Sequence, residues 1–175
     1  MDSIPQQLLL QAILILINAF FAMTEIAVIS LNPGKLRMLA EEGDKTAPRL
    51  LKLVEEPSGF LSTIQIAITL SGFLGAAFAG DAFAESLTAW LLGLGVGLPA
   101  SVLNTVSLVA VTVVLSYFTL VFGELVPKRI AMQKPLQAAR FTCGVVMAIA
   151  AVLRPVVWLL SVSTNGLLRL LRLPT

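Results

Sequence analysis

Three long apolar runs dominate this chain of 175 residues and place it in a membrane. They cover residues 4–31, 60–79 and 98–122; the first carries one charge, Glu25, and the other two carry none. Each is long enough for a helix that crosses the hydrocarbon layer, which takes about 20 apolar residues. Charged residues make up 13% of the sequence, against ~25% in soluble domains. We therefore predict an all-α integral membrane protein with three transmembrane helices.

The segments between and after these runs predict further helices. The first run lacks the basic start and the small-residue cleavage site of a signal peptide, so we expect a retained helix. Residues 33–58 are dense in charge and carry leucines on one side, which predicts juxtamembrane helices broken at Gly43 and Pro48.

The last apolar stretch, residues 141–168, has Arg154 and Pro155 in its middle. A charge and a helix-breaking ring both disfavour a crossing there. We predict a helical hairpin over residues 135–171, whose two halves of about 13 residues are each too short to cross. A kinked fourth span that ends outside is the alternative.

The basic residues predict the orientation. None lies between Lys52 and Lys128, whereas segments 32–58 and 128–140 hold most of them. Because cytoplasmic loops are enriched in lysine and arginine, both segments should be cytoplasmic. The loop 80–97 has acidic but no basic residues and should be external. We expect a multi-pass plasma-membrane protein with its N-terminus external and its C-terminus cytoplasmic.

The composition excludes several chemistries. Without histidine the chain cannot build a Ser-His-Asp triad, a Cys-His pair or an HExxH zinc site. Cys143 is the single cysteine, so one chain can form neither a disulfide nor a thiolate metal site. The aspartates lie outside the apolar runs, which argues against an aspartyl intramembrane protease. We expect neither an enzyme nor, in the absence of an aromatic and basic platform, a partner for nucleic acid.

Each predicted span also has a polar face. In the first, Gln11, Asn18 and Glu25 recur every seven residues, with Ala22 on the same face. The polar face of the second span is formed by Ser62, Gln65, Thr69 and Gly72, and Ser71 lies beside it. The polar face of the third span is formed by Thr112, Ser116, Thr119 and Gly123, and it leads to Glu124. Small hydroxyl residues often serve only close helix packing, but that account does not cover carboxylates in an apolar layer.

Glu124 is the strongest candidate for a functional residue. It follows Gly123 and precedes Pro127, and this pair predicts a broken helix whose free carbonyls face a cavity. Carboxylate, hydroxyl, amide and carbonyl oxygens without imidazole or thiolate suit a hard cation, magnesium or calcium, and sodium is compatible. For Glu25 a structural role near the inner interface is an equal alternative.

Residues 18–27 (NAFFAMTEIA), 61–70 (LSTIQIAITL) and 122–128 (FGELVPK) together resemble the transmembrane domain of the CorC/cyclin M (CNNM) family of magnesium transporters, which includes bacterial hemolysin-like proteins. The resemblance spans nearly the whole chain and keeps the family's order of segments. It implies a homodimer of three-helix domains in the lipid bilayer, with a belt of cytoplasmic-side helices. The transported Mg²⁺ would sit largely dehydrated in an inward-facing acidic cavity, with export coupled to Na⁺. The family usually continues into cytosolic CBS domains, to which nothing here corresponds.

The resemblance also implies the ligands of the ion. They are the Gly123 carbonyl, the Glu124 carboxylate, Ser71 and first-helix oxygens between Asn18 and Glu25. Some relatives have serine where this chain has Ala22, so the hydroxyl there is either absent or supplied by Thr24. Ser116, on the polar face of the third span, completes the set of candidates.

Two functions compete for this pattern. In the first, the chain is a magnesium exporter that works by alternating access around the ion. In the second, it is a membrane anchor or sensor that transports nothing and regulates a cytoplasmic partner, and its polar faces only hold the helices together. Replacing Glu124 with glutamine should impair a magnesium exporter and should have no consequence for a membrane anchor or sensor.

Overall fold

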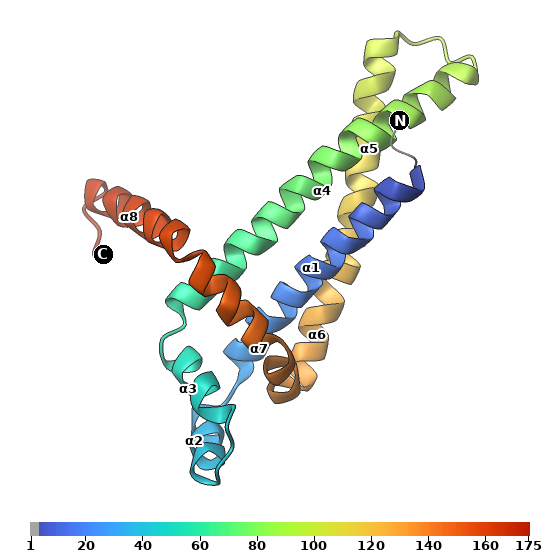
Figure 1. Ribbon diagram of the computed structural model, residues 1–175. Coiled ribbons are helices and arrows are strands. Elements are labelled where there is room, and N and C mark those ends of the chain that lie inside the picture. Colours follow the sequence, from blue (N-terminus) through green and yellow to red (C-terminus); the bar gives the residue numbers. More distant parts are fainter. Residues whose placement is uncertain (1–3) are drawn as a thin grey trace. The chain divides into compact units, whose positions relative to one another are not determined.

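The computed structural model describes residues 4–175, except for the side chain of Asp81, and this part of the chain is helical and has no strands (Figure 1). Residues 1–3, where we expect the external N-terminus, lie outside the described part. The chain divides into two compact units. One comprises Met1–Met23 and Ala67–Ile130, the other Thr24–Ile66 and Ala131–Thr175. The predicted all-α class is confirmed.

Three long helices build the first unit: parts of α1 (Ile4–Ser30) and α4 (Ser58–Gly93), and the whole of α5 (Ala100–Leu120). Side-chain contacts join them. The Gln11 amide Nε2 of α1 donates to the Gly75 carbonyl of α4 at 3.0 Å, and Thr88 Oγ1 of α4 lies 3.4 Å from Asn104 Oδ1 of α5. The three helices therefore lie side by side in this unit.

Helix α4 is longer than the sequence indicated. Residues 80–97 were expected to form an external loop, but the helix continues to Gly93. This part of the expectation is wrong because the end of the apolar run was taken as the end of the helix, whereas the alanine, leucine and glutamate residues that follow are good helix formers. The true stop is the glycine-rich segment after residue 93, where Gly95 has a φ of +80°. At 1.5 Å per residue, α4 is about 54 Å long, more than the hydrocarbon layer requires.

Helix α5 does not break at Gly123. It continues through a π-helical segment, η1 (Val121–Leu125), into α6 (Val126–Gln133), giving one apolar helix over Ala100–Gln133. The sequence thus predicted the correct position of a helix irregularity, but the predicted break is wrong because the helix continues. A wider turn accommodates the proline without ending the helix.

In the second unit, two short helices occupy the charged segment: α2 (Pro33–Glu41) and α3 (Ala47–Glu55). Leu36 and Leu50 are fully buried and supply part of the core of this unit. The break between the helices includes Gly43, whose φ of +95° suits glycine. Pro48 lies in the first turn of α3, where a missing N–H costs nothing, so it helps to begin a helix and does not break one.

Asp44 ties this break to a distant part of the chain. Its Oδ1 accepts from the Thr46 and Ala47 amides at 2.8 and 3.1 Å, which caps α3. Its Oδ2 accepts from the Arg140 guanidinium of α7 (Pro135–Val152). The two amide bonds, and then the Arg140 charge, hold the pKa of Asp44 below its ordinary value of 3.8. The carboxylate therefore fixes the short helices against α7.

The segment for which a helical hairpin was predicted contains two helices. Helix α7 ends at Val152, Leu153 forms the turn, and α8 runs over Arg154–Leu170 with Pro155 in its first turn. The halves are longer than the 13 residues expected, because α7 begins at Pro135 and not near residue 141. Its 18 residues make it long and apolar enough to cross a membrane.

Four helices of the described chain therefore have the length and composition of a membrane span, where three were expected. They are Ile4–Ser30, Ser58–Gly93, Ala100–Gln133 and Pro135–Val152.

Candidate functional site

A proline without an amide hydrogen frees one carbonyl in the middle of a long helix. In an α-helix the Gly123 carbonyl would accept from the amide of residue 127, but that residue is Pro127, which has no N–H. The π-helical segment lies at this point. Such segments are frequent at functional sites because they leave backbone groups available.

Asn18 of α1 takes up this carbonyl. Its Nδ2 donates to Gly123 O at 2.9 Å, and the Asn18 side chain is 2% exposed. The approach needs glycine, since a Cβ at residue 123 would lie 3.1 Å from Nδ2 and 3.5 Å from the Ile15 carbonyl. A second bond of the same kind, from Gln11 to Gly75, lies two turns earlier on α1. Two buried amides thus join α1 to backbone carbonyls of its neighbours.

A small polar cavity lies between these two bonds. Its volume is about 20 Å³, and it has contributions from α1, α4 and α5. The lining residues are Gln11, Leu14, Ile15, Asn18, Ser71, Gly72, Gly75, Leu115 and Thr119. A cavity must offer at least ~10–15 Å³ of this kind to hold one water molecule, so this one takes a single water or a small bare ion. We call it the junction cavity.

The structure brings together three of the predicted site residues. Asn18 and Ser71 line the junction cavity, and the Gly123 carbonyl bonds to Asn18. Glu124 follows Gly123 within the π-helical segment and is half-buried. Ala22 is fully buried on α1 and offers no side-chain oxygen.

The other predicted residues do not line the junction cavity. Ser116 is exposed and donates to the Thr112 carbonyl of its own helix at 2.7 Å, so only Thr119 of that polar face reaches the cavity. Thr24, fully buried, and Glu25, half-buried, belong to the part of α1 in the second unit.

The polar face assigned to the second span also differs. Ser71, Gly72 and Gly75 line the cavity, whereas Gln65 and Thr69 are exposed. A period of three and four residues selects a face but does not say which face meets another helix, which explains the difference.

Gln7 and Thr119 extend the polar set beyond the predicted ligands. Gln7 is 9% exposed, and its Oε1 has no hydrogen-bond partner among the described residues. It lies four residues before Gln11, so the spacing of the polar face could have found it. No group of three or more Asp, Glu, Cys or His side chains that could hold a metal comes together in the described part. A cation here would rely on neutral oxygens and few carboxylates.

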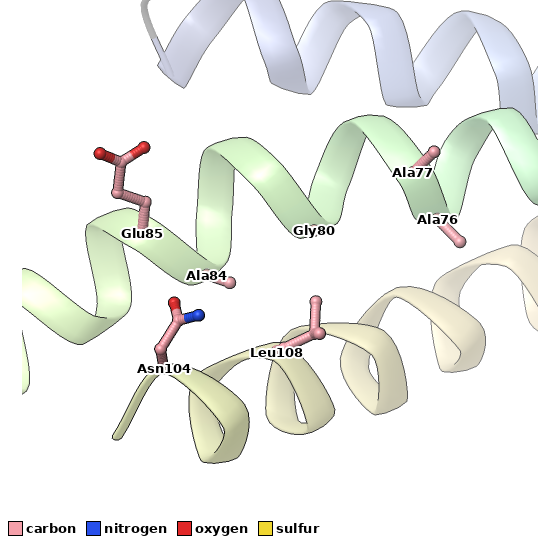
Figure 2. Close-up of a pocket in the computed structure, with 7 residues that line it drawn as sticks. All are labelled: Ala76, Ala77, Gly80, Ala84, Glu85, Asn104 and Leu108. Carbon is pink, nitrogen blue, oxygen red and sulfur yellow. The ribbon is translucent and has the colours of Figure 1, made fainter. Parts of the chain in front are cut away.

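A larger cavity of about 470 Å³ separates α4 from α5 further along the first unit (Figure 2). Figure 2 shows Leu108 pointing to Gly80, while Glu85 points away from α5. A Cβ at residue 80 would lie 3.0 Å from Leu108 Cδ1, so the glycine allows the close approach. The remaining lining consists of Ala76, Ala77, Ala84 and Asn104. Small residues of α4 thus line the cavity, and Gly80 is the point at which α4 and α5 approach closely.

Long apolar helices that meet at buried amides and a freed carbonyl define an all-α integral membrane protein with a polar junction inside its helix bundle. Residues 9–175 match the family described as the cyclin M transmembrane N-terminal domain (CNNM). The chain belongs to this family, which confirms the resemblance found in its sequence.

Several relatives match almost the whole chain. A UPF0053 protein of Synechocystis sp. is 38% identical over 172 residues, 97% of this chain and 37% of that protein. Polyamine export proteins of Haemophilus influenzae and Salmonella typhimurium are each 32% identical, over 93% and 92% of this chain and 37% and 35% of those proteins. The chain thus spans less than two-fifths of the length of these relatives.

Proposed function

We propose that this chain is the transmembrane domain of a cation exporter and that Mg²⁺ is its transported ion. The observation that carries the proposal is the junction cavity with the freed Gly123 carbonyl beside it. Residues with amide and hydroxyl side chains from three helices line this cavity, and hard cations prefer oxygen ligands of these kinds. The matched family and the names of two relatives support a role in membrane transport.

The volume of the junction cavity favours a small ion. At about 20 Å³ it has no room for an ion with a full hydration shell. Mg²⁺ bound there would exchange most of its water for protein oxygens. Asn18 would contribute by turning its amide, so that Oδ1 and not Nδ2 faces the ion.

Glu124 would supply the negative charge. It is the carboxylate next to the freed carbonyl, and the sequence gives η1 no basic residue. A site with one carboxylate and several neutral oxygens binds an ion more weakly than an acidic cluster, and a transported ion must also leave. In this proposal the ion moves by alternating access, with Na⁺ coupling and a homodimer as further expectations.

Titration calorimetry tests the site. We expect Mg²⁺ to bind the detergent-purified protein saturably, and Glu124→Gln and Ser71→Ala each to weaken binding at least about tenfold, since each removes a ligand. Ser116→Ala is the matched control: it removes a hydroxyl on α5 that is bonded to its own helix, and binding should be unchanged. Equal binding by the wild type and Glu124→Gln would contradict the assignment.

A polyamine is the second candidate, on the ground that two relatives are named polyamine export proteins. An elongated organic cation does not fit a cavity of 20 Å³, but the 470 Å³ cavity would admit one. Titration with spermidine in the same series separates the two. If the protein bound spermidine but not Mg²⁺, and if replacing Glu85 removed the binding of spermidine, a polyamine would replace Mg²⁺ as the proposed substrate. No binding of either would favour the anchor or sensor.

A further inference from the structure

The second unit has a cavity of its own, distinct from the junction cavity. Its volume is about 270 Å³, and it lies among the end of α3, the start of α4, α7 and the start of α8. Most of its lining is apolar or small: Leu53, Gly59, Phe60, Thr63, Met147, Ala150, Ala151 and Val157. Phe60 and Thr63 are buried and form part of its wall. We call it the hairpin cavity.

Two opposite charges complete the lining of the hairpin cavity. Glu56 follows α3, and Arg154 is the first residue of α8. Neither belongs to the two ion pairs found in the described part of the chain, which join Arg37 to Glu55 and Arg140 to Asp44. An apolar cavity therefore carries a cation and an anion that do not neutralise each other directly.

Helix α8 indicates where this cavity lies in the membrane. Its residues Arg154, Ser161 and Asn165 follow at steps of seven and four, which puts them on one face of the helix. Leucine and valine side chains predominate on the other faces, where the Ser163 and Thr164 hydroxyls donate to carbonyls of α8 itself, and α8 has no buried residue. An amphipathic helix of this kind lies in the interface between water and lipid, with its apolar side in the acyl region. In this arrangement Arg154 would lie at headgroup level.

We propose that the hairpin cavity binds the headgroup of an aminophospholipid, one that carries both a phosphate diester and a primary ammonium, as phosphatidylethanolamine does. Arg154 bonds to the phosphate, for which a guanidinium has matching geometry. Glu56 accepts from the ammonium. The two charges of the cavity thereby match the two charges of one zwitterionic ligand, and the membrane supplies that ligand at this depth.

The size of the hairpin cavity agrees with this ligand. Its volume of about 270 Å³ is more than ten times the 20 Å³ of the junction cavity, which takes a single water. A phosphoethanolamine headgroup, which consists of a phosphate group, two carbons and one nitrogen, fits a cavity of this size. The acyl chains would leave the cavity and continue into the bilayer along the apolar side of α8. The lipid would thereby connect α3, α7 and α8.

Native mass spectrometry of the purified chain tests this proposal. The protein is mixed with phosphatidylethanolamine, phosphatidylcholine and phosphatidylglycerol in equal amounts, and bound lipid is counted by mass. We expect phosphatidylethanolamine to bind in preference to the other two. Arg154→Gln should lower its binding about tenfold, the usual effect of losing a charge-assisted hydrogen bond, and Arg154→Lys should keep most of it. Glu56→Gln should abolish the preference over phosphatidylcholine and leave binding itself in place.

Matched controls separate the cavity from the rest of the surface. Arg172→Gln removes an exposed charge just beyond the end of α8, and Glu42→Gln removes an exposed carboxylate from the end of α2; neither residue lines the cavity. Both should bind lipid as the wild type does. Equal losses in cavity and control variants would overturn the proposal, as would a preference for phosphatidylglycerol or equal binding of all three lipids. Soluble glycerophosphoethanolamine that competes as well as the lipid would exclude a role for the acyl chains.

This lipid site does not depend on the transport proposal. Its residues belong to the second unit, whereas the junction cavity belongs to the first. Failure of Mg²⁺ binding would leave the lipid experiment unaffected, and failure of lipid selectivity would leave the calorimetry unaffected. Should Arg154→Gln not fold, Glu56→Gln and Arg154→Lys still decide the outcome.

Discussion

At the scale of single residues, Asn18 and Gly123 are the pair on which the candidate site depends. The asparagine is almost fully buried, and its amide bonds to the Gly123 carbonyl, which lacks its α-helical donor because residue 127 is proline. A buried amide without such a partner would be costly, so the bond fixes the distance between α1 and η1.

Gly123→Ala tests this close approach. The added Cβ would lie 3.1 Å from Asn18 Nδ2 and force the amide away, so we expect the stability to fall by about 1 kcal/mol and Mg²⁺ binding to weaken. Gly144→Ala is the control, because a Cβ there meets nothing within 4 Å and alanine favours the helix by up to ~1 kcal/mol. Thermal unfolding in detergent compares them. A Gly123→Ala protein as stable as Gly144→Ala would show that the approach has no energetic role.

The sequence predicted individual site residues unevenly. Asn18 was conspicuous as a polar residue within an apolar run, Gly123 was selected by the proline that follows it, and Ser71 was implied by the family resemblance. The sequence also selected Ser116, which the structure places on an exposed face, since a serine that bonds to its own helix looks the same in sequence as one that faces a cavity. The bond between Asn18 and Gly123 joins residues 105 positions apart, and no local pattern contains that information.

At the scale of elements, apolar length predicted the helices, and their ends were the uncertain part. The approximate positions of α1, α2, α3 and α5 follow from hydropathy and turn residues. The end of α4 did not, because helix-forming residues continue beyond the apolar run. The π-helical segment could not be predicted either: a proline after a glycine indicates disturbed helix, but whether that helix breaks or widens depends on what packs against it.

Pro127→Ala tests the element that contains this segment. Alanine restores an amide donor for the Gly123 carbonyl, so the π-helical turn should relax toward an α-helix. We expect the unfolding temperature to rise and Mg²⁺ binding to weaken, so that the variant is more stable but binds the ion less well. Calorimetry and thermal unfolding of the same preparation measure both. Unchanged Mg²⁺ binding in a more stable protein would separate the carbonyl from the ion site.

At the scale of the whole molecule, Asp44 joins the short helices to α7 across 96 residues of sequence. Its pKa is lower in the folded protein than its ordinary value of 3.8, so the folded state binds this proton less readily than the unfolded state. The stabilisation is complete above pH 3.8 and is lost as the pH falls through the lower, folded value.

Asp44→Asn therefore has an effect that depends on pH. We expect the variant to unfold at a lower temperature than the wild type near pH 6, because Arg140 loses its partner, and the difference to shrink as the pH falls below 4. Glu42→Gln, with an exposed carboxylate close by, should show no such dependence. Thermal unfolding at several pH values measures this. A difference that stays constant down to pH 3 would contradict the role of the Asp44 charge.

The orientation of the molecule in the membrane is also testable. The distribution of lysine and arginine predicts that the loop between α2 and α3 is cytoplasmic and the loop between α4 and α5 is external. Single cysteines at Glu42→Cys and Gly97→Cys, in a Cys143→Ala background, report this through a maleimide that does not cross membranes. Residue 97 should react in intact cells, and residue 42 only after permeabilisation. If residue 42 reacted in intact cells and residue 97 only after permeabilisation, the predicted orientation of the chain would be reversed, and with it the side of the membrane to which the ion site opens.

The π-helical segment has a consequence for register. An α-helix turns by about 100° for each residue, so one additional residue in a turn rotates everything that follows by about this angle. Lys128 and Arg129, which come directly after η1, thus point in a direction that a regular continuation of α5 would not give them. A chain shortened by one residue between Val121 and Leu125 would keep its length almost unchanged, yet it would present its first basic residues after the span to a different neighbour.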